Sequence, residues 1–224
     1  MEELLFIQQE VAPALLKGVW VSIQLIVPSA IFGLIIGIIC GVLRVYGPPI
    51  LKGLAGLYVL FFQGFPLLVQ LYLWYFGLPR IGIYLSPFTA AFIGFSLCSG
   101  AYHSEYIRGA LMSIKRGQLL AADSLGFSRA QTVFFILLPQ AVRRALPGSG
   151  NELIYLIKYS SLAYMVTCIE LTGQGKMLAN YYFKYLEIFM IVGLIYLAMV
   201  SVATWGLNAL EDYVAVPGFE RPKI

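Results

Sequence analysis

The chain has 224 residues, of which 60% are hydrophobic and only 12% are charged, and its mean hydropathy is +0.82. This composition excludes a soluble globular domain and is typical of a single membrane domain, residues 1–224, that crosses the bilayer several times. The net charge of +4 comes from basic residues that flank apolar runs, which argues against a nucleic-acid partner. The three cysteines have neither Cys-x-x-Cys nor metal-ligand spacing, so we expect them to be packing residues.

Five apolar segments are each long enough, or nearly so, to cross the hydrocarbon core as a helix. They predict an all-α membrane protein with spans at about residues 15–43, 53–77, 87–112, 151–168 and 186–210. In the first span, Gly33, Gly37 and Gly41 recur every four residues and form a stripe that favours close helix packing. The fifth span has few polar residues and is expected to be scaffold.

The second span contains Gly64 and Pro66, which predict a broken or kinked helix. Gln63 and Gln70 are seven residues apart and would share one face of a continuous helix. That face is therefore a candidate wall of a transport pathway.

Residues 115–147 form the one long polar interruption in the chain. Gly117 can turn the chain into a short helix, and Gly126 can end it, because glycine tolerates the left-handed conformation found at helix ends. The expected apolar side of this helix consists of Leu119, Leu120, Ala122 and Leu125.

A second short helix is expected directly after the first. Ser128 and Gln131 have the spacing of a capping box, and we expect Pro139 to end the helix that they open. A ten-residue helix covers roughly 15 Å, about half the hydrocarbon thickness, so neither helix can cross the bilayer. The pair is either an ordinary cytoplasmic connection or a docking element.

The spacing within this stretch favours the second alternative. Leu120-Ala121-Ala122 is followed after three residues by Gly126, and after nine more by Ile136-Leu137-Leu138-Pro139. This pattern resembles the EAA loop of ABC importer permeases. Residues that extend the resemblance to the polar amino acid permeases are Pro66, Gln70, Tyr102, Glu105, Arg108, Gln131, Gln140, Arg144, Asn151, Lys158 and Ser161. The family has glutamate where this chain has Leu120, which makes the docking surface more apolar.

The resemblance implies a type I importer fold, with about five transmembrane helices and a coupling helix that docks on a cytosolic ATPase. By this resemblance, the ATPase-coupling residues are Gly117, Leu120, Ala121, Ala122, Leu125, Gly126 and Phe127.

The resemblance also implies partners. They are two copies of a cytosolic ABC ATPase that binds ATP and magnesium, a second permease subunit that is identical or related, and an extracytoplasmic amino acid-binding protein. The chain itself is expected to hold no cofactor and no metal, and its other contacts are membrane lipid and the amino acid.

Basic residues indicate the orientation, because cytoplasmic loops of membrane proteins are enriched in lysine and arginine. The first and third loops carry Arg44, Lys52, Lys115, Arg116, Arg129, Arg143 and Arg144. We therefore expect these two loops on the cytoplasmic side of the membrane, with the amino terminus outside and the carboxyl-terminal tail inside. The resemblance implies that this membrane is the bacterial inner membrane.

Catalytic motifs are missing from the sequence. Gly173-Gln174-Gly175-Lys176 is followed by Met177 instead of serine or threonine, and Glu170 replaces the first glycine of a phosphate-binding loop. A single histidine, His103, excludes an HExxH zinc site, and no GxSxG motif occurs. His103 is expected to be a packed residue, and the chain is expected to be a non-catalytic subunit.

Ionisable residues within spans are costly in lipid and are functional candidates. Glu105 is either a pathway residue or a local partner of Arg108. Glu152 is either a pathway residue or a first-turn acid favoured by the helix dipole. Lys158 contacts the substrate or pairs with Glu105 across the bundle. The full set of candidate pathway residues is Gln63, Ser104, Glu105, Asn151, Glu152, Lys158, Ser160 and Ser161.

A dehydrated zwitterion needs an acid for its ammonium group and hydrogen-bond donors for its carboxylate. The two glutamates supply the first, and two acids beside one pathway favour a substrate with a cationic side chain. The resemblance implies that the chain is the permease subunit of an ATP-driven importer of polar amino acids, and this is our prediction. Two alternatives are an ABC permease for another small solute and an ATPase-independent secondary transporter, and an intramembrane enzyme is the least favoured.

Overall fold

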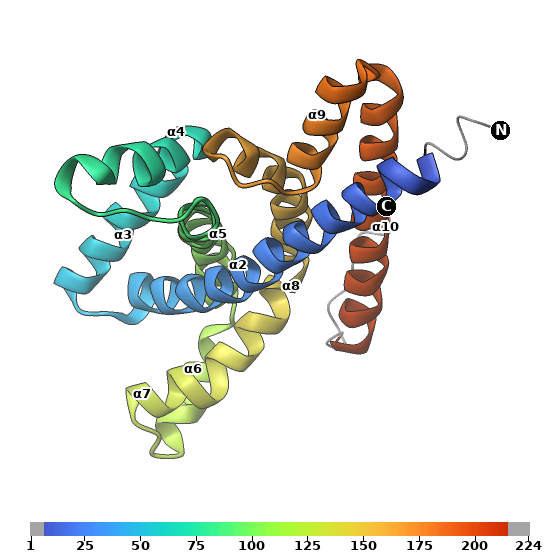
Figure 1. The fold of residues 1–224 in the computed structure, drawn as a ribbon. Coiled ribbons are helices and arrows are strands. Elements are labelled where there is room, and N and C mark those ends of the chain that lie inside the picture. Colours follow the sequence, from blue (N-terminus) through green and yellow to red (C-terminus); the bar gives the residue numbers. More distant parts are fainter. Residues whose placement is uncertain (1–6, 215–224) are drawn as a thin grey trace.

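The computed structural model describes residues 7–214, which form helices and short connections without a strand. Helices α2 and α5 cross at the centre, α3 and α4 lie on one side, and α9 and α10 lie on the other (Figure 1). The prediction that the amino terminus lies outside and the carboxyl terminus inside concerns mainly residues 1–6 and 215–224, which lie outside the described residues.

Helix α2 (Ala12–Tyr46) and helix α5 (Pro87–Met112) pack through the predicted glycine stripe. A Cβ atom on Gly37 would lie 2.2 Å from the Cβ atom of His103. Equivalent atoms on Gly33 and Gly41 would lie 2.8 Å from Ser99 Oγ and 2.7 Å from Ile107 Cγ2. The prediction of close packing is confirmed. Because both sets of residues advance along the chain together, α2 and α5 run in the same direction and end at the same side of the bundle.

Between these two helices the chain returns through a broken helical pair. Helix α3 (Pro49–Gly64) and the segment Leu67–Ile81, which begins with α4 (Leu67–Tyr72), meet at an angle of 102°. The predicted break at Gly64 and Pro66 is confirmed. The expectation that Gln63 and Gln70 share one helix face is wrong, because the break separates them.

Gln70 instead stabilises the break. Its buried Nε2 donates hydrogen bonds to the carbonyl oxygens of Phe62 at 2.9 Å and Phe65 at 2.8 Å. These carbonyls belong to the end of α3, where no further helical turn supplies N–H donors.

The polar stretch leads into a long helix. Helix α7 (Arg129–Gln131) continues through a π-helical segment, η4 (Thr132–Leu137), into α8 (Leu138–Tyr159). The prediction that Pro139 ends a short helix is wrong, because a proline in the first turn of a helix needs no N–H partner. Since α8 begins at Leu138 and not near residue 151, Glu152 lies well inside it and is not a first-turn acid.

After α8 come η5 (Ser160–Val166), α9 (Leu171–Tyr182) and α10 (Tyr185–Val214). The sequence did not predict α9, which replaces the expected loop after the fourth span. The segment Arg129–Val166 and α9 are bent by 54° relative to each other.

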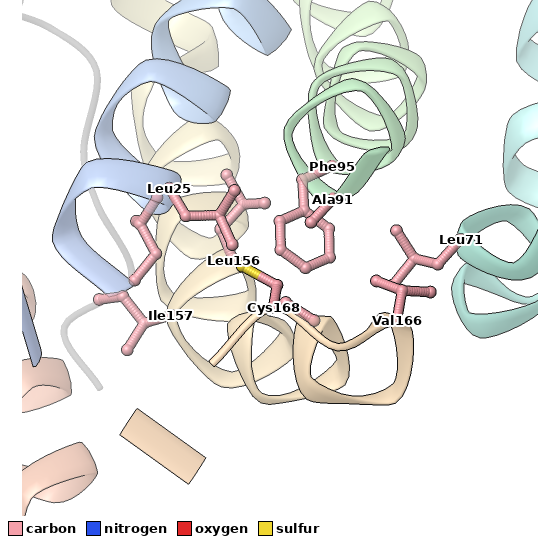
Figure 2. Packing of buried hydrophobic residues seen from close by; sticks show 10 residues of the cluster. Leu25, Leu71, Ala91, Phe95, Leu156, Ile157, Val166 and Cys168 are labelled. Atoms are coloured by element: carbon pink, nitrogen blue, oxygen red, sulfur yellow. The ribbon is translucent and has the colours of Figure 1, made fainter. Parts of the chain in front are cut away.

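The main hydrophobic cluster joins α2, α4, α5, α8 and η5. Figure 2 shows the fully buried ring of Phe95 at its centre, with Leu156 of α8 on one side and Leu71 of α4 on the other. Leu25 of α2 and Val166 of η5 complete the contacts. This cluster fixes α5 as the central helix.

By length and apolar composition, Ile7–Tyr46 and Tyr185–Val214 can each cross a membrane. The two bent pairs can do so if each counts as one span. The described part of α5 carries Ser96, Ser99, His103 and Ser104 as buried polar residues, so the surrounding helices shield it. The number of five spans stays a prediction.

Candidate substrate pathway and coupling loop

Glu152 is a buried acid on α8 that faces α5. Its exposed fraction is 3%, and it lies close to Ser99, Tyr102 and Tyr106 of α5. No basic side chain forms an ion pair with it in residues 7–214. A buried carboxylate without a basic partner is costly and is a candidate site for a cation.

Four tyrosines surround this acid. Tyr155 and Tyr159 of α8 stack with ring centroids 5.9 Å apart and an interplanar angle of 14°. Both are open to the surroundings, with exposed fractions of 45% and 38%, and Tyr102 and Tyr106 of α5 are half-buried beside them. Aromatic faces attract ammonium groups, so this set, the tyrosine face, suits a cationic group next to Glu152.

Close contacts between α5 and α8 hold this face in place. His103 Nδ1 lies 3.2 Å from Ser149 Oγ, and a Cβ atom on Gly148 would lie 2.8 Å from the Tyr106 ring. His103 is buried, which confirms the expectation that it is a packed residue.

Glu105 lies on another side of α5, between two arginines. Its carboxylate oxygens lie 2.6 Å from Arg44 and 2.7 Å from Arg108, so the predicted local pair with Arg108 is confirmed. Arg44 also donates to Ser104 Oγ at 3.3 Å. The expected pair between Lys158 and Glu105 is wrong, because Lys158 is exposed and lies 5.5 Å over the Tyr155 ring.

The remaining candidate pathway residues are dispersed. Gln63 Nε2 donates to the Ala101 carbonyl at 3.3 Å, which joins α3 to α5. The hydroxyl groups of Ser160 and Ser161 each donate a 2.8 Å hydrogen bond to the carbonyl oxygen three residues earlier, that of Ile157 and of Lys158 respectively. Asn151 is exposed at the edge of α8. Among the candidate pathway residues, Glu152 and Lys158 therefore lie beside the tyrosine face, and Asn151 is exposed on the same helix.

Sequence reasoning missed a second buried acid, Glu170, which precedes α9. It is fully buried and accepts hydrogen bonds from Tyr196 Oη at 2.8 Å and from the N–H groups of Thr172 and Gly173 at 2.9 and 3.0 Å. Ser22 Oγ also donates to it at 3.4 Å. This acid therefore ties α9 to α2 and α10. The signal in the sequence was weak, because glutamate is not a common residue at a helix N-cap.

The segment between α5 and α8, residues 113–137, is the candidate coupling loop. It projects from the end of α5, where α6 and α7 extend away from the other helices (Figure 1). Helix α6 (Arg116–Ser124) is followed by Gly126 with a φ of 79°, as predicted for a glycine that ends a helix. Ser128 and Gln131 form both hydrogen bonds of the predicted capping box.

The apolar residues of α6 do not share one side as expected. Ala122 is buried, and Leu119 is half-buried, but Leu120 and Leu125 are 59% and 76% exposed. Phe127, Gly117 and Ala121 are also exposed. Because apolar side chains project outward at a loop tip, this loop is suited to dock on another protein.

Comparison with known proteins gives the family. Residues 33–215 match the model of the binding-protein-dependent transport system inner membrane component. The probable amino-acid ABC transporter permease protein YckA of Bacillus subtilis is 42% identical over 91% of this chain and 90% of its own length. The glutamine transport system permease protein GlnP of Escherichia coli is 36% identical over 89% of this chain and 92% of its own.

Solved structures agree with these relatives. The crystal structure of an amino acid ABC transporter with histidines has a TM-score of 0.84 and 29% identity, and the match covers 92% of this chain and 96% of that one. The MetNI methionine ABC transporter, with a TM-score of 0.80 and 21% identity over 93% of this chain and 99% of its own, shows the same fold. The chain therefore belongs to the inner membrane components of binding-protein-dependent transport systems and is a permease subunit of the ABC importer class, whose energy comes from a separate ATPase.

Proposed function

We propose that this permease imports a polar amino acid and that its pathway passes the tyrosine face beside Glu152. The observation that carries the proposal is a buried carboxylate without a basic partner among the described residues, next to four tyrosines on α5 and α8. The relatives include a probable amino-acid permease and a glutamine permease, and they favour the same substrate class.

The chemistry of the face matches a zwitterion. Glu152 pairs with the substrate ammonium group, which the tyrosine rings also attract. Lys158 and Asn151 are exposed on the same helix and supply donors for the substrate carboxylate. Arg44 and Arg108 neutralise Glu105, so that of the two candidate acids only Glu152 is free for the substrate. The prediction of a cationic substrate side chain required both acids and is therefore weakened.

Transport is coupled to ATP hydrolysis through α6. Leu120, Leu125 and Phe127 insert into a groove of the ATPase, so that closure of two ATPase subunits moves two coupling loops. The motion reaches the pathway directly, because the loop begins at the end of α5 and continues into α8. These two helices carry the tyrosine face.

The complete transporter, in this proposal, contains two permease subunits, two cytosolic ATPase subunits and an extracytoplasmic amino acid-binding protein. ATP and magnesium bind to the ATPase, and this chain is non-catalytic. The coupling loop lies in the cytoplasm, with the amino terminus outside and the carboxyl terminus inside.

The proposal is tested by measuring ATP hydrolysis of the reconstituted complex with its binding protein across a panel of amino acids. We expect one chemical class to stimulate hydrolysis. Absence of stimulation by every amino acid in an assembled complex would refute the substrate class. A complex without Leu119–Gly126 should lose both the ATPase and transport, and retention of both would refute the coupling mechanism.

A further inference from the structure

A pocket lies between the ends of α2, α3 and α5, lined by none of the residues of the tyrosine face. It has a volume of about 470 Å³ and is lined by Arg44, Val45, Lys52, Gly56, Arg108 and Met112. We call it the basic pocket.

The charges of the basic pocket favour an anion. Three cations line it, and the one carboxylate near them, Glu105, is held between Arg44 and Arg108. Lys52 forms no ion pair with any residue in the described range 7–214. The pocket therefore keeps a net positive charge, with the Lys52 ammonium group available to a ligand.

The pocket continues into an apolar surface. A Cβ atom on Gly56 would meet no atom within 4 Å, so this glycine leaves open space in the wall. Leu60, one turn after Gly56 on the same face of α3, is 71% exposed, and Met112, which lines the pocket, is 66% exposed. A ligand with an anionic head and apolar chains fits this combination better than a small free anion does.

The position of the pocket also suits a lipid. Since α2 and α5 run in the same direction, Arg44 and Arg108 lie near the ends of these helices on the side where α5 leads into the coupling loop. Basic pockets between membrane helices on the cytoplasmic side bind the headgroups of anionic lipids.

We propose that the basic pocket binds the phosphate of an anionic phospholipid, with its acyl chains along Met112 and Leu60. Lys52 and Arg108 contact the phosphate, and Gly56 provides room for the glycerol backbone. This site is independent of the proposed substrate site, because neither Lys52 nor Gly56 belongs to the pathway or the coupling loop.

The test is native mass spectrometry of the purified permease–ATPase complex titrated with phosphatidylglycerol, and with phosphatidylcholine of the same chains. We expect saturable binding of phosphatidylglycerol and weaker binding of phosphatidylcholine. Lys52→Gln should weaken phosphatidylglycerol binding roughly fivefold, and Lys52→Arg should retain it. Gly56→Leu should also weaken binding, because its side chain fills the pocket without a change of charge.

Two variants serve as matched controls. Lys17→Gln removes an exposed lysine near the opposite end of α2, and Gly193→Leu adds a side chain to α10 where a Cβ atom meets nothing within 4 Å. Neither should alter lipid binding. Equal binding of the two lipids, an unchanged Lys52→Gln complex or equal effects of the control variants would overturn the proposal. Displacement of phosphatidylglycerol by millimolar inorganic phosphate would instead identify a free-anion site and overturn the lipid assignment.

Discussion

Helix α5 has two very different sides. Toward α2, Ser99, His103 and Ile107 lie so close to glycines that an added methyl group would overlap them. Toward α8, Tyr102 and Tyr106 stay half-buried beside the acid of the facing helix. The tight contacts with α2 fix α5, and this in turn positions the polar groups on its partly exposed side toward α8, the open side, before a substrate arrives.

The largest expected effect comes from breaking the close-packed side. Gly37→Leu places a side chain where its Cβ atom would be 2.2 Å from that of His103, so α2 and α5 must separate. We expect a destabilisation of about 3 kcal/mol, seen as loss of folded protein or a lower Tm of the purified complex. Gly193→Leu is the control, since its Cβ atom meets nothing within 4 Å. Equal Tm values for both variants would contradict the tight contact.

The buried acid Glu170 tests a second tightly packed contact, the one that joins α9 to α2 and α10. Glu170→Ala leaves Tyr196 Oη, Ser22 Oγ and the first N–H groups of α9 without their acceptor. We expect a loss of about 2–3 kcal/mol and faster hydrogen exchange in α9. The matched control, Glu187→Ala, removes an exposed acid and should leave both measurements unchanged. Normal protection of α9 in Glu170→Ala would show that this acid does not anchor the helix.

The coupling loop differs from both sides of α5, because three of its apolar residues, Leu120, Leu125 and Phe127, are exposed in the single chain. Leu125→Asn should leave the fold intact and weaken association with the ATPase by about 2 kcal/mol, roughly thirtyfold. The measurement is the concentration of ATPase that half-saturates the permease. Tyr84→Asn, at another exposed position, is the control. Unchanged affinity of the Leu125→Asn variant would place the docking surface elsewhere.

The smallest expected effect is that of Gln63→Ala. Its side chain makes one neutral hydrogen bond of 3.3 Å to the Ala101 carbonyl, so its removal should cost about 0.5–1 kcal/mol of stability. Uptake should change little when it is measured at a temperature well below Tm. Loss of uptake without a change in Tm would instead assign Gln63 to the pathway.

The sequence predicted local features of this fold well. Spacing and residue type were enough for the glycine stripe, the break near Pro66, and the helix end at Gly126, because each depends on neighbouring residues or on one repeated pattern. The capping box of Ser128 and Gln131 is of the same kind.

Features that depend on contacts distant in sequence were missed or misplaced. Pro139 was expected to end a helix, but the preceding π-helical segment lets the helix continue, and this moves Glu152 from a helix start to a helix interior. The partners of Glu170 lie on α2 and α10, so its role was not visible in its local sequence. The predicted pair between Lys158 and Glu105 does not form, because Arg44 already neutralises Glu105.

The central claim is that the open side of α5 carries the substrate, and uptake of the stimulating amino acid by proteoliposomes tests it most directly. Glu152→Gln keeps the shape of the side chain and removes its charge. We predict at least a roughly tenfold loss of uptake at low substrate concentration, with ATPase association and basal hydrolysis retained. Glu187→Gln should transport normally. Uptake by Glu152→Gln at the level of this control would contradict the account.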